Sequence, residues 1–192
     1  MAVPADVDDY LKRLSETVMN IDKESLNEAI RTLLDTRDRD GTIYIFGNGG
    51  SAATASHCVC DFNKGISLKL DKKFNFVCLS DNTATVTAIA NDIGYDEIYR
   101  IQLKDRLKKN DLIFAISGSG NSKNIINAVE YAREQGVKVI SLTGYDGGKL
   151  LGLSDCPIHI KVNDMQIAED AHMMVCHLIA SVIARHLGNP MC

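Results

Sequence analysis

The stretch TIYIFGNGGSAATASHCVCD, residues 42–61, decides the fold class of this 192-residue chain. A short apolar run at 42–46 precedes a glycine-rich turn and a segment that we expect to be helical through about residue 63. A strand, a tight turn and a helix in this order form the first half of a βαβ unit. Such a turn, at the end of a buried strand, is also a common binding place for negatively charged ligands.

Further strands and helices alternate along the chain. Apolar runs predict strands at 74–79, 112–116, 137–142 and 158–162. Helical periodicity predicts helices at about 84–91, 122–135 and 166–187, and two earlier ones within 6–36 that are separated by a break near 22–25. We therefore expect one α/β domain over residues 1–192, a three-layer, doubly wound, five-stranded parallel sheet with an N-terminal helical extension (1–38).

Composition and charge exclude several classes of function. The net charge is -4 and no run of lysines and arginines stands out, which argues against a nucleic-acid partner. We expect a cytoplasmic protein without a membrane partner, because we find neither a signal-peptide pattern nor about 18 uninterrupted apolar residues. The six cysteines include no C-x-x-C pair, so we expect reduced thiols that act as small apolar residues.

The glycine turn after the first strand has two interpretations. The run from Gly47 to Ala52 fits G-x-G-x-x-A, and the second strand ends at an acid, Asp81, as in a dinucleotide-binding domain. In dinucleotide-binding domains the acid usually follows the glycine pattern by about 20 residues, and Asp81 lies well beyond that spacing. The glycine pattern alone is a weak signal for a dinucleotide site. A dinucleotide site would also leave the loop after the third strand unexplained.

Three serines mark that loop, SGSGNS at 117–122. Ser117, Ser119 and Ser122 lie at the expected start of a helix, where hydroxyls, free backbone N–H groups and the helix dipole together suit a phosphate. The alternative is that the serines only cap the helix. Three serines in six residues favour an anion site, and no Walker lysine follows to indicate a nucleoside triphosphate.

Together, GNGGS at 47–51, AIANDIGYDEIY at 88–99 and SGSGNS at 117–122 resemble the sugar isomerase (SIS) domain, and more narrowly its phosphoheptose isomerase branch. The resemblance covers nearly the whole chain. It implies that Ser117, Gly118, Ser119 and Ser122 hold a substrate phosphate. It also implies that further residues contact the sugar, namely Asn48, Gly49, Gly50, Ser51, Asp92 and Glu169.

The resemblance further implies zinc ligands at His57, Asp61, Glu169 and His177. Asp61 stands where the family usually has Glu, Glu169 where it has Gln, and Gly118 where it has Thr. Spacing alone places His57 and Asp61 on one helix face. Glu169 and His177 lie two turns apart, roughly 12 Å, so they meet one ion only by reaching toward each other or from different subunits. The alternatives to a metal site are that His57 and Asp61 form only a surface hydrogen bond and that His177 is a histidine of the core.

The activity that the resemblance implies is the isomerisation of sedoheptulose 7-phosphate to D-glycero-D-manno-heptose 7-phosphate through an enediol. Asp61 and His177 would be the acid/base pair, and the assembly a homotetramer. The apolar faces of the N-terminal helices, which exceed what the sheet needs, agree with self-association. Two alternatives stay open, a non-catalytic SIS regulator that associates with the bacterial replication initiator and an isomerase of another phosphosugar. We expect the remaining histidines to be structural, namely His159, His172 and His186.

Overall fold

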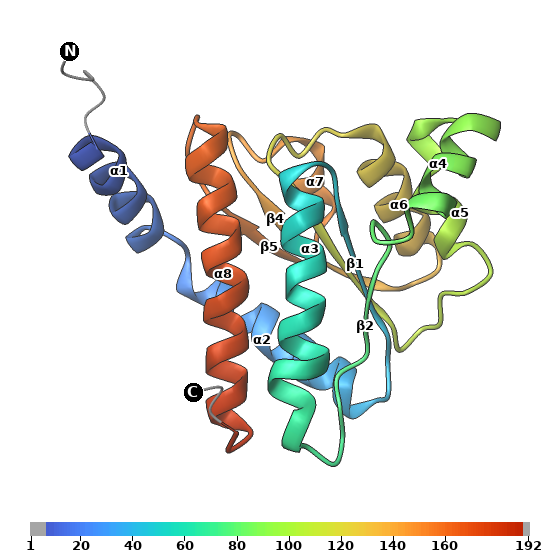
Figure 1. Ribbon diagram of the computed structural model, residues 1–192, viewed down its shortest axis with the longest axis horizontal. Coiled ribbons are helices and arrows are strands. Elements are labelled where there is room, and N and C mark those ends of the chain that lie inside the picture. The colour runs from blue at the N-terminus through green and yellow to red at the C-terminus, as the bar shows by residue number, and fades with distance from the viewer. Residues whose placement is uncertain (1–6, 190–192) are drawn as a thin grey trace.

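Five parallel strands form the centre of the computed structural model, which describes residues 7–189 (Figure 1). Their order across the sheet is β2–β1–β3–β4–β5. The strands are β1 Ile43–Gly47, β2 Phe76–Cys78, β3 Leu112–Ser117, β4 Lys138–Thr143 and β5 Cys156–His159. In the pairing register Ile43 lies opposite both Phe76 and Leu112, and Ser117 lies opposite Thr143. The predicted doubly wound parallel sheet is confirmed.

Alternating side chains of the strands build two cores, one on each face of the sheet. Ile43 and Ile45 belong to the core covered by α2 Lys23–Asp38, α3 Gly50–Cys60 and α8 Met165–His186. Phe46, which points the other way, belongs to the core covered by α5 Arg100–Leu103, α6 Lys123–Glu134 and α7 Gly148–Leu153. A strand with both faces buried must be apolar throughout, which is why the strands read as near-continuous apolar runs.

The strand order places a topological switch point between β1 and β3. In open parallel sheets, ligands bind outside the carboxyl ends of the strands at such a point. Here the loops that leave the two strands are the glycine turn after β1 and the serine loop after β3. The fold therefore brings the two most informative loops of the sequence to one edge of the sheet.

Two strand predictions were inaccurate at their ends. The strand predicted at 74–79 is paired in register over Phe76–Cys78, and its backbone hydrogen bonds with β1 extend to Asn75 and Leu79. The last strand runs over Cys156–His159 and not over 158–162. Its partner β4 ends at Thr143, whose carbonyl accepts from the Ile160 N–H (2.7 Å), and the next residue, Gly144, donates to the Gly118 carbonyl, so the regular ladder ends there. Two short helices, α5 and α7, were not predicted.

Helix α3 continues beyond Cys60 in a changed geometry. Residues Asp61–Ile66 form a π-helical segment and Ser67–Lys69 a 3₁₀ turn. Such π-helical segments frequently occur at functional sites. Cys58 is buried and Cys60 is exposed, so the two thiols lie on different sides of the helix, and both are free.

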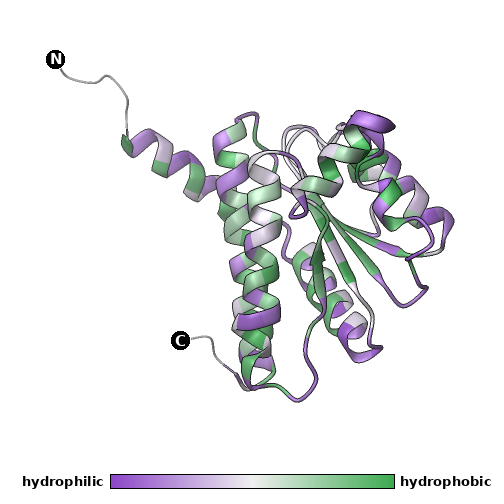
Figure 2. Ribbon diagram, turned by 45° about the vertical axis from the view of Figure 1, so that its right-hand side comes forward, coloured by the Kyte–Doolittle hydropathy of each residue, from purple (hydrophilic) through white to green (hydrophobic). Residues whose placement is uncertain are grey.

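The N-terminal helix α1, Val7–Met19, stands apart from the sheet (Figure 1). None of its residues is buried, and its polar side chains hold it to α8 through Tyr10 to Asp170 (2.6 Å) and Arg13 to Asp164 (2.8 Å). Apolar and polar residues alternate along it (Figure 2), and Leu11 is 56% exposed. The expected apolar face therefore exists and is largely uncovered within one chain.

Helix α8 is long and apolar enough to cross a membrane by length and composition alone. It is nevertheless a core helix of this fold, since Val175, Ile179 and Ile183 along its length are fully buried against α3 and the sheet. Its N-terminus is capped by Asp164, whose carboxylate accepts from the backbone N–H groups of Gln166 and Ile167.

Candidate active site

A cavity of about 140 Å³ lies between the loop after β1 and the loop after β3. It contains most of the predicted substrate-binding residues. The lining residues are Asn48, Ser51, Ile116, Ser117, Gly118, Ser119, Ser122, Met165 and Glu169. We call this the loop cavity. The switch-point geometry explains why residues more than 60 positions apart in sequence meet here.

The three loop serines have different local roles. Ser117 accepts a hydrogen bond from the Gly120 N–H (3.1 Å), and Ser119 accepts one from the Asn121 N–H (3.2 Å), so both shape the turn. Ser122 is the N-cap residue of α6, yet its hydroxyl makes no capping bond. A serine kept only as a cap would accept from the first turn of the helix. The free hydroxyl of Ser122 therefore supports an anion site over simple capping.

At two glycines the loops approach other groups closely, and at Gly120 the neighbour is fixed backbone. Gly120 has φ +63°, and a Cβ there would lie 2.0 Å from the Gly147 carbonyl oxygen. A Cβ at Gly50 would lie 2.4 Å from a carboxylate oxygen of Glu169. Glu169, on α8, therefore reaches the N-terminus of α3, where the positive end of the helix dipole favours a carboxylate.

Asp92 does not reach the loop cavity within this chain. It is the last residue of α4, Thr83–Asp92, is exposed, and accepts a hydrogen bond from the side chain of Asn91 (2.8 Å). Among the described residues, its predicted contact with the sugar therefore has no counterpart in this chain's own loop cavity.

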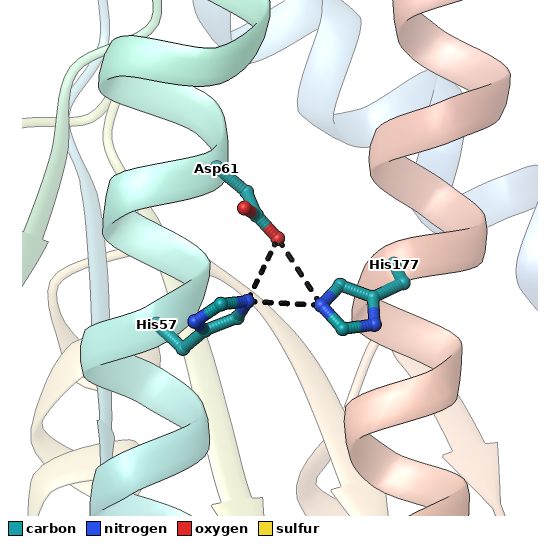
Figure 3. Close-up of side chains that lie close together, drawn as sticks. All are labelled: His57, Asp61 and His177. Atoms are coloured by element: carbon teal, nitrogen blue, oxygen red, sulfur yellow. Dashed lines mark hydrogen bonds and ion pairs between the residues drawn. The ribbon is translucent and has the colours of Figure 1, made fainter. Parts of the chain in front are cut away.

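His57, Asp61 and His177 form a second polar cluster (Figure 3). The two Nε2 atoms lie 2.9 Å apart, and Asp61 Oδ2 lies 3.5 Å from each of them. His57 comes from α3, Asp61 from the first residue of the π-helical segment, and His177 from α8, so the neighbouring helices bring them together. Both imidazoles are about half exposed, at 47% and 51%, while the carboxylate is 19% exposed.

The residues of this cluster fit a divalent metal. Asp61 Oδ2 is buried and makes no hydrogen bond within the described residues, an arrangement that is costly unless a cation or proton compensates it. Two imidazoles and a carboxylate are ligands that zinc prefers, and zinc ligands at about 2.0–2.2 Å in tetrahedral arrangement lie about 3.3–3.6 Å apart. The two 3.5 Å distances match this spacing. A metal bound here would have three protein ligands and an open position, as catalytic zinc sites do.

Glu169 is not part of this cluster, which departs from the predicted set of four ligands. Helix geometry gives the reason. Eight residues along α8 correspond to about 12 Å, and the Glu169 carboxylate is directed to Gly50 at the start of α3. The structure thus separates the two functions that the sequence assigned to this residue, and places it at the loop cavity with the substrate-binding residues.

The loop cavity and the histidine cluster lie along the same two helices. Helices α3 and α8 run side by side (Figure 1). Both begin at residues that line the cavity, Ser51 in the first turn of α3 and Met165 at the start of α8. His57 lies seven residues after Gly50, and His177 eight residues after Glu169, so the separation along the helices is roughly 10–12 Å. Between the cavity and the cluster, Ala53 lies about one turn of α3 from both Gly50 and His57. Met173 lies one turn of α8 from both Glu169 and His177.

Some residues of the site were not predicted. Met165 lines the loop cavity and also a larger neighbouring cavity of about 680 Å³. A Cβ at Gly118 would lie 3.0 Å from Met165 Sδ, so Met165 occupies the space next to the position where the family usually has Thr. Asn124, Tyr95 and Tyr99 contact the side chain of Asn48. The two tyrosines lie within the stretch AIANDIGYDEIY, so the sequence did contain a signal for them.

His172 is buried on α8, as expected of a structural histidine. Burial lowers its pKa to about 4, so the imidazole is neutral at physiological pH. Neither ring nitrogen makes a hydrogen bond within the described residues.

Comparison with known proteins agrees with this geometry. The family model of the SIS domain matches residues 7–144. A phosphoheptose isomerase of Helicobacter pylori (strain Shi470) is 39% identical over 171 residues, 86% of this chain and 88% of that protein. A probable phosphoheptose isomerase of Thermoplasma volcanium is 34% identical over 93% of this chain and 90% of its own. The solved structure of phosphoheptose isomerase GmhA from Neisseria gonorrhoeae has a TM-score of 0.81 at 31% identity, covering 89% of this chain and 91% of its own.

Proposed function

Because this chain belongs to the phosphoheptose isomerase family of SIS-domain proteins, it is an aldose–ketose isomerase, and we propose that its substrate pair is sedoheptulose 7-phosphate and D-glycero-D-manno-heptose 7-phosphate. The observation that carries this proposal is the arrangement of an anion-binding loop cavity and an acid/base cluster along the same two helices. The substrate phosphate would bind at the cavity and the carbonyl end at the cluster.

The length of the substrate supports this orientation. The separation of roughly 10–12 Å between the cavity and the cluster follows from the rise of 1.5 Å per residue along α3 and α8. An extended seven-carbon chain with C–C bonds of about 1.5 Å, together with its phosphate ester, spans roughly 10 Å from the carbonyl end to phosphorus. A shorter sugar phosphate held by the same serines would leave its carbonyl carbon farther from His177 and Asp61.

The side chains of the cluster suit the two proton transfers of an isomerisation. Asp61 Oδ2 would remove the proton from the carbon beside the carbonyl, and would return it to the neighbouring carbon to complete the aldose. In the metal-free cluster, His177 Nε2 would move a proton between the two oxygens of the enediol; with a metal held at this nitrogen, stabilisation of those oxygens would come from the metal instead. The 3.5 Å between Asp61 Oδ2 and His177 Nε2 lets both act on adjacent atoms of one substrate.

A divalent metal, zinc by ligand type, would be held by His57, Asp61 and His177. When bound, it supplies Lewis-acid polarisation of the carbonyl oxygen and stabilises negative charge on the enediol oxygens. His57 would then act as a ligand only, which agrees with its exposed position beside the other two residues.

Of the alternative functions, a non-catalytic SIS regulator is disfavoured by the cluster itself. A protein that only bound a phosphosugar would need the serine loop, but not an acid and two histidines brought together from two helices. An isomerase of another phosphosugar would use the same two sites, and it would be recognised by faster turnover of a hexose phosphate than of sedoheptulose 7-phosphate.

We place the enzyme in the cytoplasm as a homotetramer. The uncovered apolar residues Val7, Leu11 and Met19 on α1 support self-association, since contiguous exposed apolar faces mark interaction surfaces. Asp92, exposed and outside the loop cavity of its own chain, would contact the sugar across such a contact.

Isomerisation in D₂O tests the proposed reaction. We expect deuterium at C2 of the aldose formed from sedoheptulose 7-phosphate, because the carboxylic acid of protonated Asp61 can exchange with solvent before it returns the proton. The product is analysed by mass spectrometry and NMR. Turnover with an unlabelled product at every time point would argue for direct hydride transfer and against the enediol.

A further inference from the structure

The side chain of Asn48 lies in a dense hydrogen-bond network. Its carbonyl oxygen Oδ1 accepts from Asn124 Nδ2 (2.9 Å) and from the hydroxyls of Tyr95 and Tyr99 (both 3.1 Å). Its amide nitrogen donates to Asn124 Oδ1 (3.0 Å). The two asparagines therefore form a cyclic amide pair between the loop after β1 and the first turn of α6.

The backbone fixes the orientation of this pair. Asn124 Oδ1 also accepts from the Ile125 N–H (2.9 Å), and a backbone N–H can only donate. The oxygen of Asn124 is therefore assigned, its nitrogen faces Asn48 Oδ1, and the amide of Asn48 follows. Asn124 is 1% exposed, so neither amide rotates at low cost in free energy.

Two tyrosine hydroxyls complete the contacts of Asn48 from the other side. Tyr95 is exposed, while Tyr99 is 2% exposed and stacks on Phe46, with ring centroids 4.8 Å apart. The Tyr99 hydroxyl shares its one hydrogen between Asn48 Oδ1 and the Gly47 carbonyl oxygen. The oxygen of Asn48 is thus saturated, and one N–H of its amide has no partner among residues 7–189.

We propose that Asn124 is a positioning residue that orients Asn48 so that it presents one N–H donor, and no acceptor, to the substrate in the loop cavity. This inference rests on the proposed function, since the substrate atom that receives the N–H is an oxygen of the sugar phosphate. Asn124 lies two residues after Ser122, so the same helix turn that holds the anion also sets the donor on the opposite loop.

A double-mutant cycle separates positioning from a general structural role. Asn124→Ala should lower kcat/KM for sedoheptulose 7-phosphate roughly 10- to 100-fold, because the freed amide of Asn48 loses its single orientation. In the Asn48→Ala background the same substitution should change kcat/KM by no more than about two-fold, since there is no amide left to orient. An equal loss in both backgrounds would overturn the proposal.

Asn127→Ala is the matched control on the same helix. Its side chain donates to the Asp96 carbonyl and to Glu97 (both 3.0 Å) but does not contact Asn48. It should leave kcat/KM within about two-fold of wild type while losing a comparable number of hydrogen bonds. A loss as large as that of Asn124→Ala would show that kcat/KM responds to any loosening of α6.

A crystal structure of Asn124→Ala provides a readout that does not depend on turnover. We expect the Asn48 amide in more than one rotamer, with the backbone at 47–51 unchanged and with inorganic phosphate bound as tightly as by wild type. If wild type fails to isomerise the heptose phosphate, the proposed function is lost, and this structure still tests the positioning. An Asn48 amide that keeps its rotamer and its bonds to both tyrosines would contradict the inference.

Discussion

Replacing His177 with alanine is expected to lower kcat by about 10²- to 10⁴-fold, the usual contribution of a positioned acid/base group. The imidazole lies 2.9 Å from His57 and 3.5 Å from Asp61, so its removal takes away one of the three groups of the cluster. The same substitution should lower the zinc content of the purified protein, because two of the three ligands remain. Steady-state kinetics and elemental analysis on one sample measure both effects.

His186→Ala serves as the control for the His177 variant. His186 is exposed at the end of the same helix and is not part of the cluster. It should retain wild-type kcat and metal content. If His177→Ala also kept its full rate, His177 would be neither the acid/base group nor an essential ligand, and the cluster would be a surface hydrogen-bond network.

The Ser119→Ala/Ser122→Ala double variant should weaken the binding of sedoheptulose 7-phosphate by about 10²- to 10⁴-fold. Each serine is expected to donate one hydrogen bond to the phosphate, and a hydrogen bond to a charged group contributes about 1.5–3 kcal/mol. Folding should change little, because Ser122 makes no capping bond and Ser119 is exposed. Calorimetric titration gives the affinity and thermal melting the stability.

Two comparisons make the serine experiment specific. Ser25→Ala removes a hydroxyl from the first turn of α2, where it bonds only to Asp22 (2.8 Å), and should leave affinity unchanged. Unphosphorylated sedoheptulose should bind wild type and the double variant with equal weakness. Should the double variant lose the same affinity for both sugars, the serines would shape the loop and not hold the phosphate.

The fold could be predicted almost completely from the sequence because its signals are local. A strand buried on both faces must be apolar, and the glycine and serine loops mark where β1 and β3 end. The prediction placed the last strand two residues late at its start and three residues late at its end, because apolar alternation continues to Val162, while pairing depends on where the neighbouring strand ends. Sequence periodicity contains no information about that neighbour.

The site could be predicted in part, for a similar reason. The i, i+4 spacing of His57 and Asp61 is a local signal, and the switch point accounts for the meeting of the two loops. Which atoms share one point in space depends on the packing of α3 against α8. That packing brings His177 to the pair and leaves Glu169 at Gly50. Met165 and Asn124 could not be predicted, because their contacts form between distant segments.

The most direct test is the turnover of sedoheptulose 7-phosphate by wild-type protein purified without chelator, with metal content determined on the same sample. We expect formation of the aldose heptose 7-phosphate with a kcat on the order of 1–10³ s⁻¹ and about one zinc per chain. A protein with stoichiometric zinc and intact phosphate binding that forms no aldose product would contradict the assignment of the cluster of His57, Asp61 and His177 as the catalytic centre of a heptose phosphate isomerase.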